Sequence, residues 1–319
     1  MVKAVVGDEI QLNLAEGRIS RSGVTPQVGL VIGKVNPVLD RGFIYSLIPT
    51  PPNDVGDPPC SLSGPAEGDD KKKGPKYKSV PIDSSFLSID SEWVAEHARQ
   101  VSRMLIGGVK VIGIYIAVGD TVFKNSTSSF CQTLMSVSQA SSVLDAKSSE
   151  SLLLHLSFSP RRWTCRSIVS SSTISSSNLR PCDFKMNKVL NNLKPFKCNY
   201  DFELKFSVSN EGSSTMSTLR DVLRDGLSSH AKSLHAAKYL VDGKIVADTE
   251  PCPADGGSCD VEFLLPFTMS SAPIEAHKEK TVLGAVFLKG SVSSFSYASP
   301  KDPISQAVSD MKVWLQRFR

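Results

Sequence analysis

The most informative absence in this sequence of 319 residues is that of a familiar catalytic motif. It has no Gly-x-Ser-x-Gly segment that could present a nucleophilic serine, and none of its cysteines lies in a cysteine-protease signature. It also lacks an uninterrupted apolar run of the roughly twenty residues that a membrane-spanning helix needs. We therefore expect neither a hydrolase of these classes nor a transmembrane segment in this chain.

A strong charge of one sign is absent as well. The formal net charge is +4, and five lysines lie in the single run DDKKKGPKYK, so no nucleic-acid-binding surface is predicted. A nuclear-import signal or a local nucleic-acid patch is an alternative role for this lysine run. A solvated loop is the more common role of such runs. The seven cysteines are odd in number and irregularly spaced, which favours reduced thiols in a cytoplasmic protein.

Metal and cofactor sites are not predicted either. Cys252 and Cys259 flank a glycine-rich turn, but zinc would need two further ligands and only His277 is near in sequence. Gly29 to Lys34 resembles a phosphate-binding loop only superficially. Three residues rather than four separate its glycines, and Val35 follows the lysine where a hydroxyl residue is needed. His97 and His155 lie in apolar segments, where we expect satisfied core histidines, whereas His230 and His235 are expected to face solvent.

What is present is an alternation of helix and strand patterns, which predicts an α/β (mixed α+β) fold. The clearest helix covers 91–105, with a cap at Asp90 or Ser91 and a left-handed stop at Gly107-Gly108. A serine-diluted helix is predicted at 123–144 and an amphipathic one at 304–318. The predicted strands include buried ones at 24–35 and 109–118, a hairpin partner at 43–49, a hairpin of 152–158 with 163–170, and others at 200–207, 244–247, 261–265 and 282–288.

Two domains are predicted, 1–210 and 211–319, the second being a smaller α+β subdomain. The boundary is placed where Glu211-Gly212-Ser213-Ser214 separates two ordered segments. Residues 50–80 are rich in proline, glycine and charge. Such a segment cannot bury enough apolar surface to offset its ordering entropy, so a disordered insertion is predicted there.

Two long segments carry a resemblance to a known family. SEWVAEHARQVSRMLIGG and the later GAVFLKGSVSSFSYASPKDPISQAVSDMKVWL, together with GLVIGK, resemble the odorant-response-abnormal-4 family (the odr-4-like proteins). The resemblance implies a non-enzymatic protein that assists delivery of membrane receptors from the endoplasmic reticulum. It also implies a heterodimer with the cysteine protease specific for the ubiquitin-fold modifier. Members of the family usually carry a hydrophobic tail in that membrane, which is not present here, so we expect a cytoplasmic chain at its cytosolic face.

The order of elements around VIGIYIAV also looks like an MPN domain, the fold of the JAMM metalloproteases. Active members end this strand with His-x-His, followed by an aspartate, and carry a glutamate three residues before the glycine of the earlier strand. On this chain the histidine positions fall on Ile116 and Val118, the aspartate position near Ser129 and the glutamate position near Pro26. None of these side chains binds zinc, so the resemblance implies a catalytically dead MPN-like core. The alternative is a plain apolar strand in an unrelated sheet.

Three functions follow from these observations. The first is an adaptor whose helices contact the protease through an apolar stripe, with candidate contact residues Trp93, Val94, Val101, Met104, Leu105, Phe130 and Leu134. The same stripe could face the chain's own core. The second is a trafficking chaperone that grips receptor segments in an exposed apolar groove. The third is a hydrolase whose site the sequence does not reveal.

Overall fold

The computed structural model describes residues 2–23, 26–36, 39–64, 85–141, 150–169, 179–210, 218–253, 257–265, 281–300 and 302–315. These residues form two compact units. The first comprises 1–105 and 109–192, and the second comprises 106–108 and 193–319. Both units combine helices with strands, so the predicted mixed α/β class is confirmed.

The first unit is built on a closed seven-stranded sheet in the order β1-β3-β2-β6-β7-β8-β9. Its strands are β1 (Ala4–Asp8), β2 (Gln27–Asn36), β3 (Arg41–Pro49), β6 (Lys110–Ala117), β7 (Glu150–Phe158), β8 (Arg161–Val169) and β9 (Arg180–Asn187). Its helices are α1 (Glu9–Ser22), α2 (Ser91–Met104), α3 (Asp120–Asn125) and α4 (Thr127–Ser141). A separate ribbon pairs β4 (Cys60–Ser63) with β5 (Phe86–Ile89).

The strand β6 is central, as its continuous apolar sequence predicted. It pairs antiparallel with β2 and parallel with β7, and each residue from Ile112 to Ala117 is buried. Strands covered on both faces read as continuous rather than alternating apolar runs, and this is such a strand. One face packs against α2 and α4, which lie side by side, while the other belongs to a second core cluster with α1. The fold therefore places the carboxyl end of β6 beneath two adjacent helices.

The second unit is a four-stranded sheet in the order β11-β12-β10-β13, with helices α5 and α6. Its elements are β10 (Lys194–Asn210), α5 (Leu219–Ala236), β11 (Lys238–Val241), β12 (Cys259–Leu264), β13 (Thr281–Ala298) and α6 (Ile304–Leu315), with a 3-10 turn at Leu190–Asn192 just before it in the chain. Thr218 and Asp221 form a capping box that begins α5. The Lys312 ammonium on α6 donates to the carbonyls of His235 and Ala237 at the carboxyl end of α5. A positive charge there is favourable because the carboxyl end of a helix carries a partial negative charge.

Several predicted boundaries differ from the structure. The helix predicted at 123–144 is two helices, because the chain breaks at Ser126, whose hydroxyl bonds the Val122 carbonyl. The left-handed stop predicted at Gly107-Gly108 for α2 is wrong. The helix ends at Met104 and is followed by Leu105 in an extended conformation, and the Gly107 N–H instead donates to the Phe295 carbonyl of β13. No strand forms over 244–247, which is a turn and an irregular segment.

The division of the chain also differs from the prediction. The units divide between Asn192 and Leu193, because β10 starts at Lys194 and pairs along its whole length with β13 of the second unit. Residues 211–217, which suggested a boundary near 210, lie outside the described residues, as do residues 65–80 of the predicted insertion. The insertion's first part is not wholly irregular, since it includes β4.

Candidate functional site

Ile116 lies on β6 and Ser129 on α4, whereas Val118 directly follows β6 and Pro26 directly precedes β2. Gln27 pairs with Ala117, so Pro26 stands opposite the end of β6. Ile116 and Val118 belong to one buried cluster that includes Phe130 of α4, and Ser129 precedes that phenylalanine. The side chains at these four positions are apolar or, at Ser129, a half-buried hydroxyl.

The packing at this position excludes a bound ion there. Ile116 is fully buried and Val118 nearly so, in contact with the apolar side chains of the helices above them. Aliphatic side chains offer no lone pair to a metal, and a desolvated cation among them would be severely destabilised. Across the described part of the chain, no group of three or more histidine, cysteine or acidic side chains could hold a metal ion.

The thiols near this position are unsuited to nucleophilic chemistry. The Cys60 Sγ donates to the Pro26 carbonyl at 3.6 Å, and burial raises the pKa of Cys60 to about 11. Burial also raises the pKa of Cys131, which lies on α4 beside Phe130. Because the thiolate is the reactive form, both groups are held in their inert protonated state near neutral pH.

The most polar group beside the end of β6 is His155 on β7. Its Nε2 lies 2.9 Å from the Val118 carbonyl oxygen, and its Nδ1 lies 3.5 Å from the Thr164 hydroxyl. Its ring stacks on Phe123 with centroids 3.9 Å apart. A carbonyl can only accept, so Nε2 carries a proton. The ring is therefore either the neutral Nε2–H tautomer or the imidazolium ion. The prediction of a satisfied core histidine is confirmed.

Burial determines how His155 titrates. Desolvation lowers the pKa of His155, with opposing contributions from the Val118 carbonyl and Asp120 and further lowering from Arg166 and Arg162. Asp120 itself pairs with Arg162 at 2.7 Å. The folded state therefore binds its proton less readily than the unfolded state, and it disfavours the charged ring.

This pKa direction predicts an acid-sensitive first unit. Because the folded pKa lies below the unfolded value of about 6.5, the stability linked to neutral His155 is present above about pH 6.5 and is lost as the pH falls below it. We expect the urea midpoint to fall over this range, and His155→Gln, which keeps an N–H donor for Val118, to flatten the fall. His235→Gln, at an exposed position of α5, should keep the wild-type dependence. Equal slopes for the two variants would contradict this account.

A groove between α2 and α4 is the second feature of this side of the unit. It has a volume of about 450 Å³ and is lined by Glu92, Ala95, Arg99, Ser136, Gln139 and Ala140. The two alanines are nearly buried and form its narrow floor, while one acidic and one basic side chain stand on α2. The helices are tied together by the Ser91 and Thr133 hydroxyls, 2.7 Å apart. Small floor residues allow another helix to approach closely.

The seven predicted partner contacts have very different environments. Val94, Val101, Phe130 and Leu134 are core residues, so the structure places them away from any surface. The apolar stripe of α2 thus faces the chain's own core. Trp93 is half-buried, and its indole Nε1 donates to the Pro51 carbonyl at 2.8 Å.

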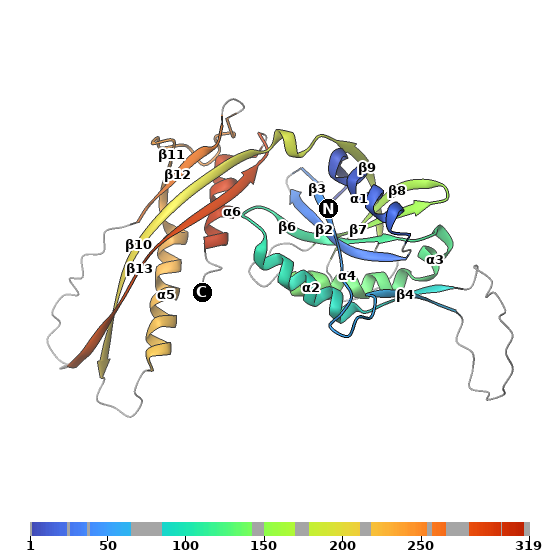
Figure 1. Cartoon of the computed structure of the whole chain (residues 1–319). Coiled ribbons are helices and arrows are strands. Elements are labelled where there is room, and N and C mark those ends of the chain that lie inside the picture. Colours follow the sequence, from blue (N-terminus) through green and yellow to red (C-terminus); the bar gives the residue numbers. More distant parts are fainter. Residues whose placement is uncertain are drawn as a thin grey trace. The chain divides into compact units, whose positions relative to one another are not determined.

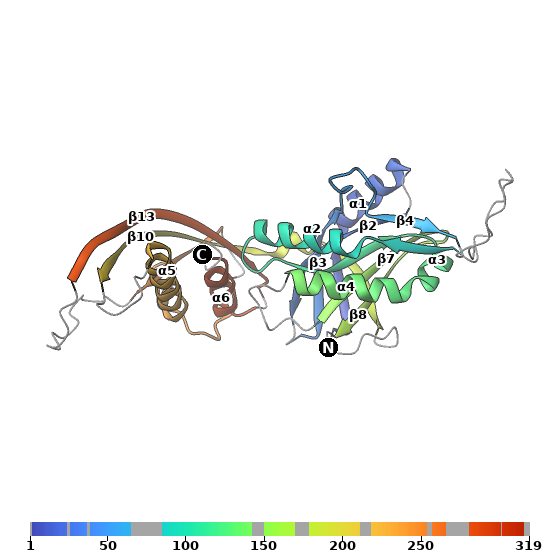
Figure 2. The same ribbon diagram turned by 90° about the horizontal axis from the view of Figure 1, so that it is seen from below.

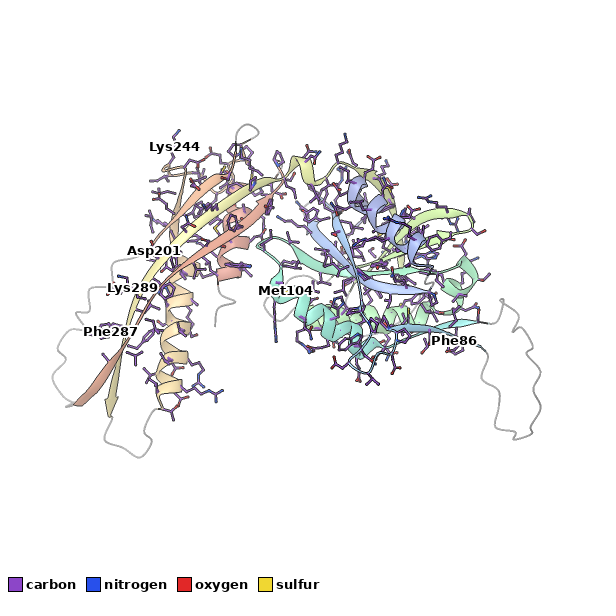
Figure 3. All side chains as sticks on the ribbon, viewed as in Figure 1. Phe86, Met104, Asp201, Lys244, Phe287 and Lys289 are labelled. Carbon is purple, nitrogen blue, oxygen red and sulfur yellow. The ribbon has the colours of Figure 1, made fainter. Side chains whose placement is uncertain are left out.

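The last two of the seven lie at the end of α2. Leu105 is half-buried and packs on the core, whereas Met104 is 74% exposed at the position marked in Figure 3. The sequence did not predict the groove. The spacing of Glu92, Ala95 and Arg99 by three and four residues could have revealed them as one face.

His97 and His230 complete the comparison of predicted and observed sites. His97 is half-buried, with Nδ1 3.2 Å from the Thr50 hydroxyl, consistent with a satisfied structural histidine. His230 was expected to face solvent, but it is half-buried against the β10 strand, where its Nε2 lies 2.9 Å from the Tyr200 hydroxyl. Desolvation lowers the pKa of both rings.

Known proteins resemble this chain over most of its length. The family model described as Odorant response abnormal 4-like matches residues 29–313. The protein odr-4 homolog of Mus musculus is 26% identical over 303 residues, covering 89% of this chain and 62% of that protein. The Homo sapiens homolog is 26% identical over 306 residues with the same coverage of both chains. The Dictyostelium discoideum homolog is 30% identical over 136 residues, covering 41% of this chain and 26% of its own.

The chain thus spans less than two thirds of the length of its mouse and human relatives. Among solved structures, the solution structure of a Desulfitobacterium hafniense protein aligns with 58% of this chain and 94% of its own at 10% identity. Its TM-score of 0.29 is too low to bear on the fold. Within the described ranges, no helix has both the length and the apolar character required to cross a membrane.

Proposed function

The chain belongs to the Odorant response abnormal 4-like family, and from this membership we propose that it is a non-catalytic adaptor. In this proposal it binds the cysteine protease specific for the ubiquitin-fold modifier, helps to place it at the cytosolic face of the endoplasmic reticulum, and so supports the biogenesis of membrane receptors. The observation that carries the non-catalytic part is the apolar packing of Ile116 and Val118 at the end of the central strand.

We further propose that the first unit is a dead MPN-like domain. This is supported by the position of Pro26, directly before the strand that pairs with the end of β6. It is also supported by the buried cluster that Ile116 and Val118 share with Phe130, the residue after Ser129. It is also supported by the protonated state of the nearby Cys60 and Cys131 thiols. A unit that has lost its ligands can still contribute a folded surface to a complex.

The α2–α4 groove is the surface that we propose for the protease, with a helix of the protease as its occupant. Its alanines suit close helix packing. Its lining also carries Glu92 and Arg99, whose guanidinium pairs with Glu96 on the same helix, so a partner acid would compete with Glu96 for it. A chaperone for varied receptor segments would call for an apolar groove instead. The charged, hydroxyl and amide side chains along this groove favour one defined partner over that alternative.

The proposal is tested by co-expressing the chain with the modifier protease and measuring co-elution in size-exclusion chromatography. We expect a 1:1 complex, and we expect Arg99→Glu to weaken it at least about tenfold because the charge reversal faces the groove. Arg103→Glu makes the same charge change on an exposed residue of the same helix outside the groove, and should bind as the wild type does.

The possible outcomes distinguish a wrong binding partner from a wrong binding surface. Separate elution of the wild-type chain and the protease at micromolar concentration would rule out the adaptor function as stated. A stable complex that Arg99→Glu and Arg103→Glu affect equally would instead keep the partner and reject the groove. Circular dichroism of both variants checks that their helix content is unchanged.

A further inference from the structure

Two cysteines outside the α2–α4 groove lie opposite each other on neighbouring strands of the first sheet. Cys165 of β8 and Cys182 of β9 are directly opposite in the antiparallel register. The two thiols are near enough for each to affect the ionisation of the other. Cβ atoms of directly opposite residues lie roughly 4.5–5.5 Å apart, close to the roughly 3.5–4.5 Å that a disulfide requires. The backbone therefore already holds the two thiols near bonding geometry.

The two thiols differ in access. Cys165 is buried, packed in the core cluster on the α1 side of the sheet. Cys182 is half-buried, and its Sγ lies 3.5 Å from the Val2 carbonyl oxygen, which also accepts from the Ser167 hydroxyl at 3.4 Å. A small reagent from solvent would therefore meet Cys182 first, with Cys165 directly behind it.

The contact between the thiols also separates their acidities. Donation by the Cys165 thiol is the largest influence on Cys182, whose pKa is lowered to about 7. Ser167 also lowers the pKa of Cys182, whereas burial and the Glu150 carboxylate raise it. The same contact, together with burial, raises the pKa of Cys165. Cys182 thus has an appreciable thiolate fraction at neutral pH, and Cys165 remains protonated and able to give a proton.

Four of the other thiols lack this combination. Burial raises the pKa of Cys60 and of Cys198 to about 11 in each case. It also raises the pKa of Cys131 and of Cys259. Since reactivity follows the thiolate fraction and exposure, Cys182 is set apart from these four.

We propose that Cys182 is an oxidation site for hydroperoxides and that Cys165 is its resolving thiol, so that the pair converts reversibly to a disulfide joining β8 to β9. The Cys182 thiolate attacks a peroxide oxygen, an S–O bond forms and the O–O bond breaks. The leaving group, hydroxide from hydrogen peroxide or alkoxide from an organic hydroperoxide, takes a proton to become water or an alcohol. The Cys165 sulfur then attacks the sulfenic sulfur while its proton goes to the leaving hydroxyl, which departs as water. Overall the two thiols lose two electrons and two protons, and the peroxide is reduced.

The test treats the full, reduced chain with hydrogen peroxide at neutral pH, blocks remaining thiols with N-ethylmaleimide, and maps peptides by mass spectrometry. We expect one linked Cys165–Cys182 peptide pair, lighter by two hydrogens, that dithiothreitol restores, while Cys60 and Cys198 stay alkylated. In the Cys182→Ser variant, Cys165 should remain reduced under the same treatment.

Two results would overturn the proposal. One is complete alkylation of Cys182 after peroxide has already oxidised other cysteines. The other is a Cys182 that proceeds to the sulfinic acid, or links to a different cysteine, without joining Cys165. Because the decisive mapping uses the unaltered chain, a folding defect in Cys182→Ser would leave the result intact.

Discussion

Replacing Gly113 by alanine is expected to destabilise the first unit by more than about 3 kcal/mol, although it adds only one methyl group. Gly113 lies in the middle of β6, paired with Val31 on one side and Leu152 on the other. A Cβ built there would collide with the carbonyl oxygen, the carbonyl carbon and the amide nitrogen of Leu152. These are backbone atoms of a buried strand, so no side-chain rotation relieves the collision, and the parallel β6–β7 pairing has to open.

The matched control is Gly119→Ala at the loop between β6 and α3. Gly119 has an ordinary extended conformation with φ −64°, and no atom lies within 4 Å of the added methyl position. We expect its free energy of unfolding to stay within about 0.5 kcal/mol of the wild type. Urea unfolding followed by circular dichroism measures both. A Gly113→Ala chain as stable as Gly119→Ala would show that β6 and β7 do not pair as closely as described.

The parts of the fold that the sequence predicted share a strong local pattern. The strand β6 and its neighbour β2 were predicted because strands buried on both faces have long apolar runs. The helix α2 was predicted because its polar and apolar residues alternate with helical period and Asp90 caps it, accepting from the Trp93 N–H at 3.0 Å. In these segments local propensity and tertiary burial agree.

The parts that were missed have patterns that tertiary contacts override. β13 was predicted only over 282–288, because serines replace the large apolar residues beyond that point. Ser294 and Ser296 are nevertheless fully buried, and the Ser296 hydroxyl donates to the Ala307 carbonyl of α6 at 2.8 Å. Small inward residues there allow α6 to pack closely. β9 was missed altogether, and with it the pairing of Cys182 with Cys165.

The groove of the candidate site could not be predicted from the sequence, because it too depends on tertiary contacts. The MPN resemblance placed its two histidine positions on Ile116 and Val118, and a two-residue interval puts both side chains on one face of a strand. The groove depends on how Ala95 of α2 and Ala140 of α4 come together, and no local pattern encodes that distance. The helix periodicity identified an apolar stripe correctly, but it could not decide whether the stripe faced the core or a partner.

The free energy of unfolding of Phe130→Ala shows whether Phe130 acts in the core or at an interface. The Phe130 ring is fully buried in the cluster with Ile116 and Leu134, and it lies 5.0 Å from the Phe123 ring. Truncating it removes its apolar contacts and leaves a cavity, which is expected to cost about 3–5 kcal/mol in the free energy of unfolding. Met104→Ala truncates a side chain that is 74% exposed, and should change that free energy by less than about 0.5 kcal/mol.

Measuring unfolding and protease binding on the same two variants distinguishes a core residue from an interface residue. If Phe130 acts only in the core, Phe130→Ala lowers the urea midpoint of the isolated chain, and the fraction that remains folded binds the protease with wild-type affinity. A Phe130→Ala chain with an unchanged midpoint and lost binding would instead make Phe130 a contact residue and contradict its burial. The argument rests on a simple asymmetry: a side chain already desolvated by its own chain has no apolar surface left to bury against a partner, so its contribution must appear in folding first.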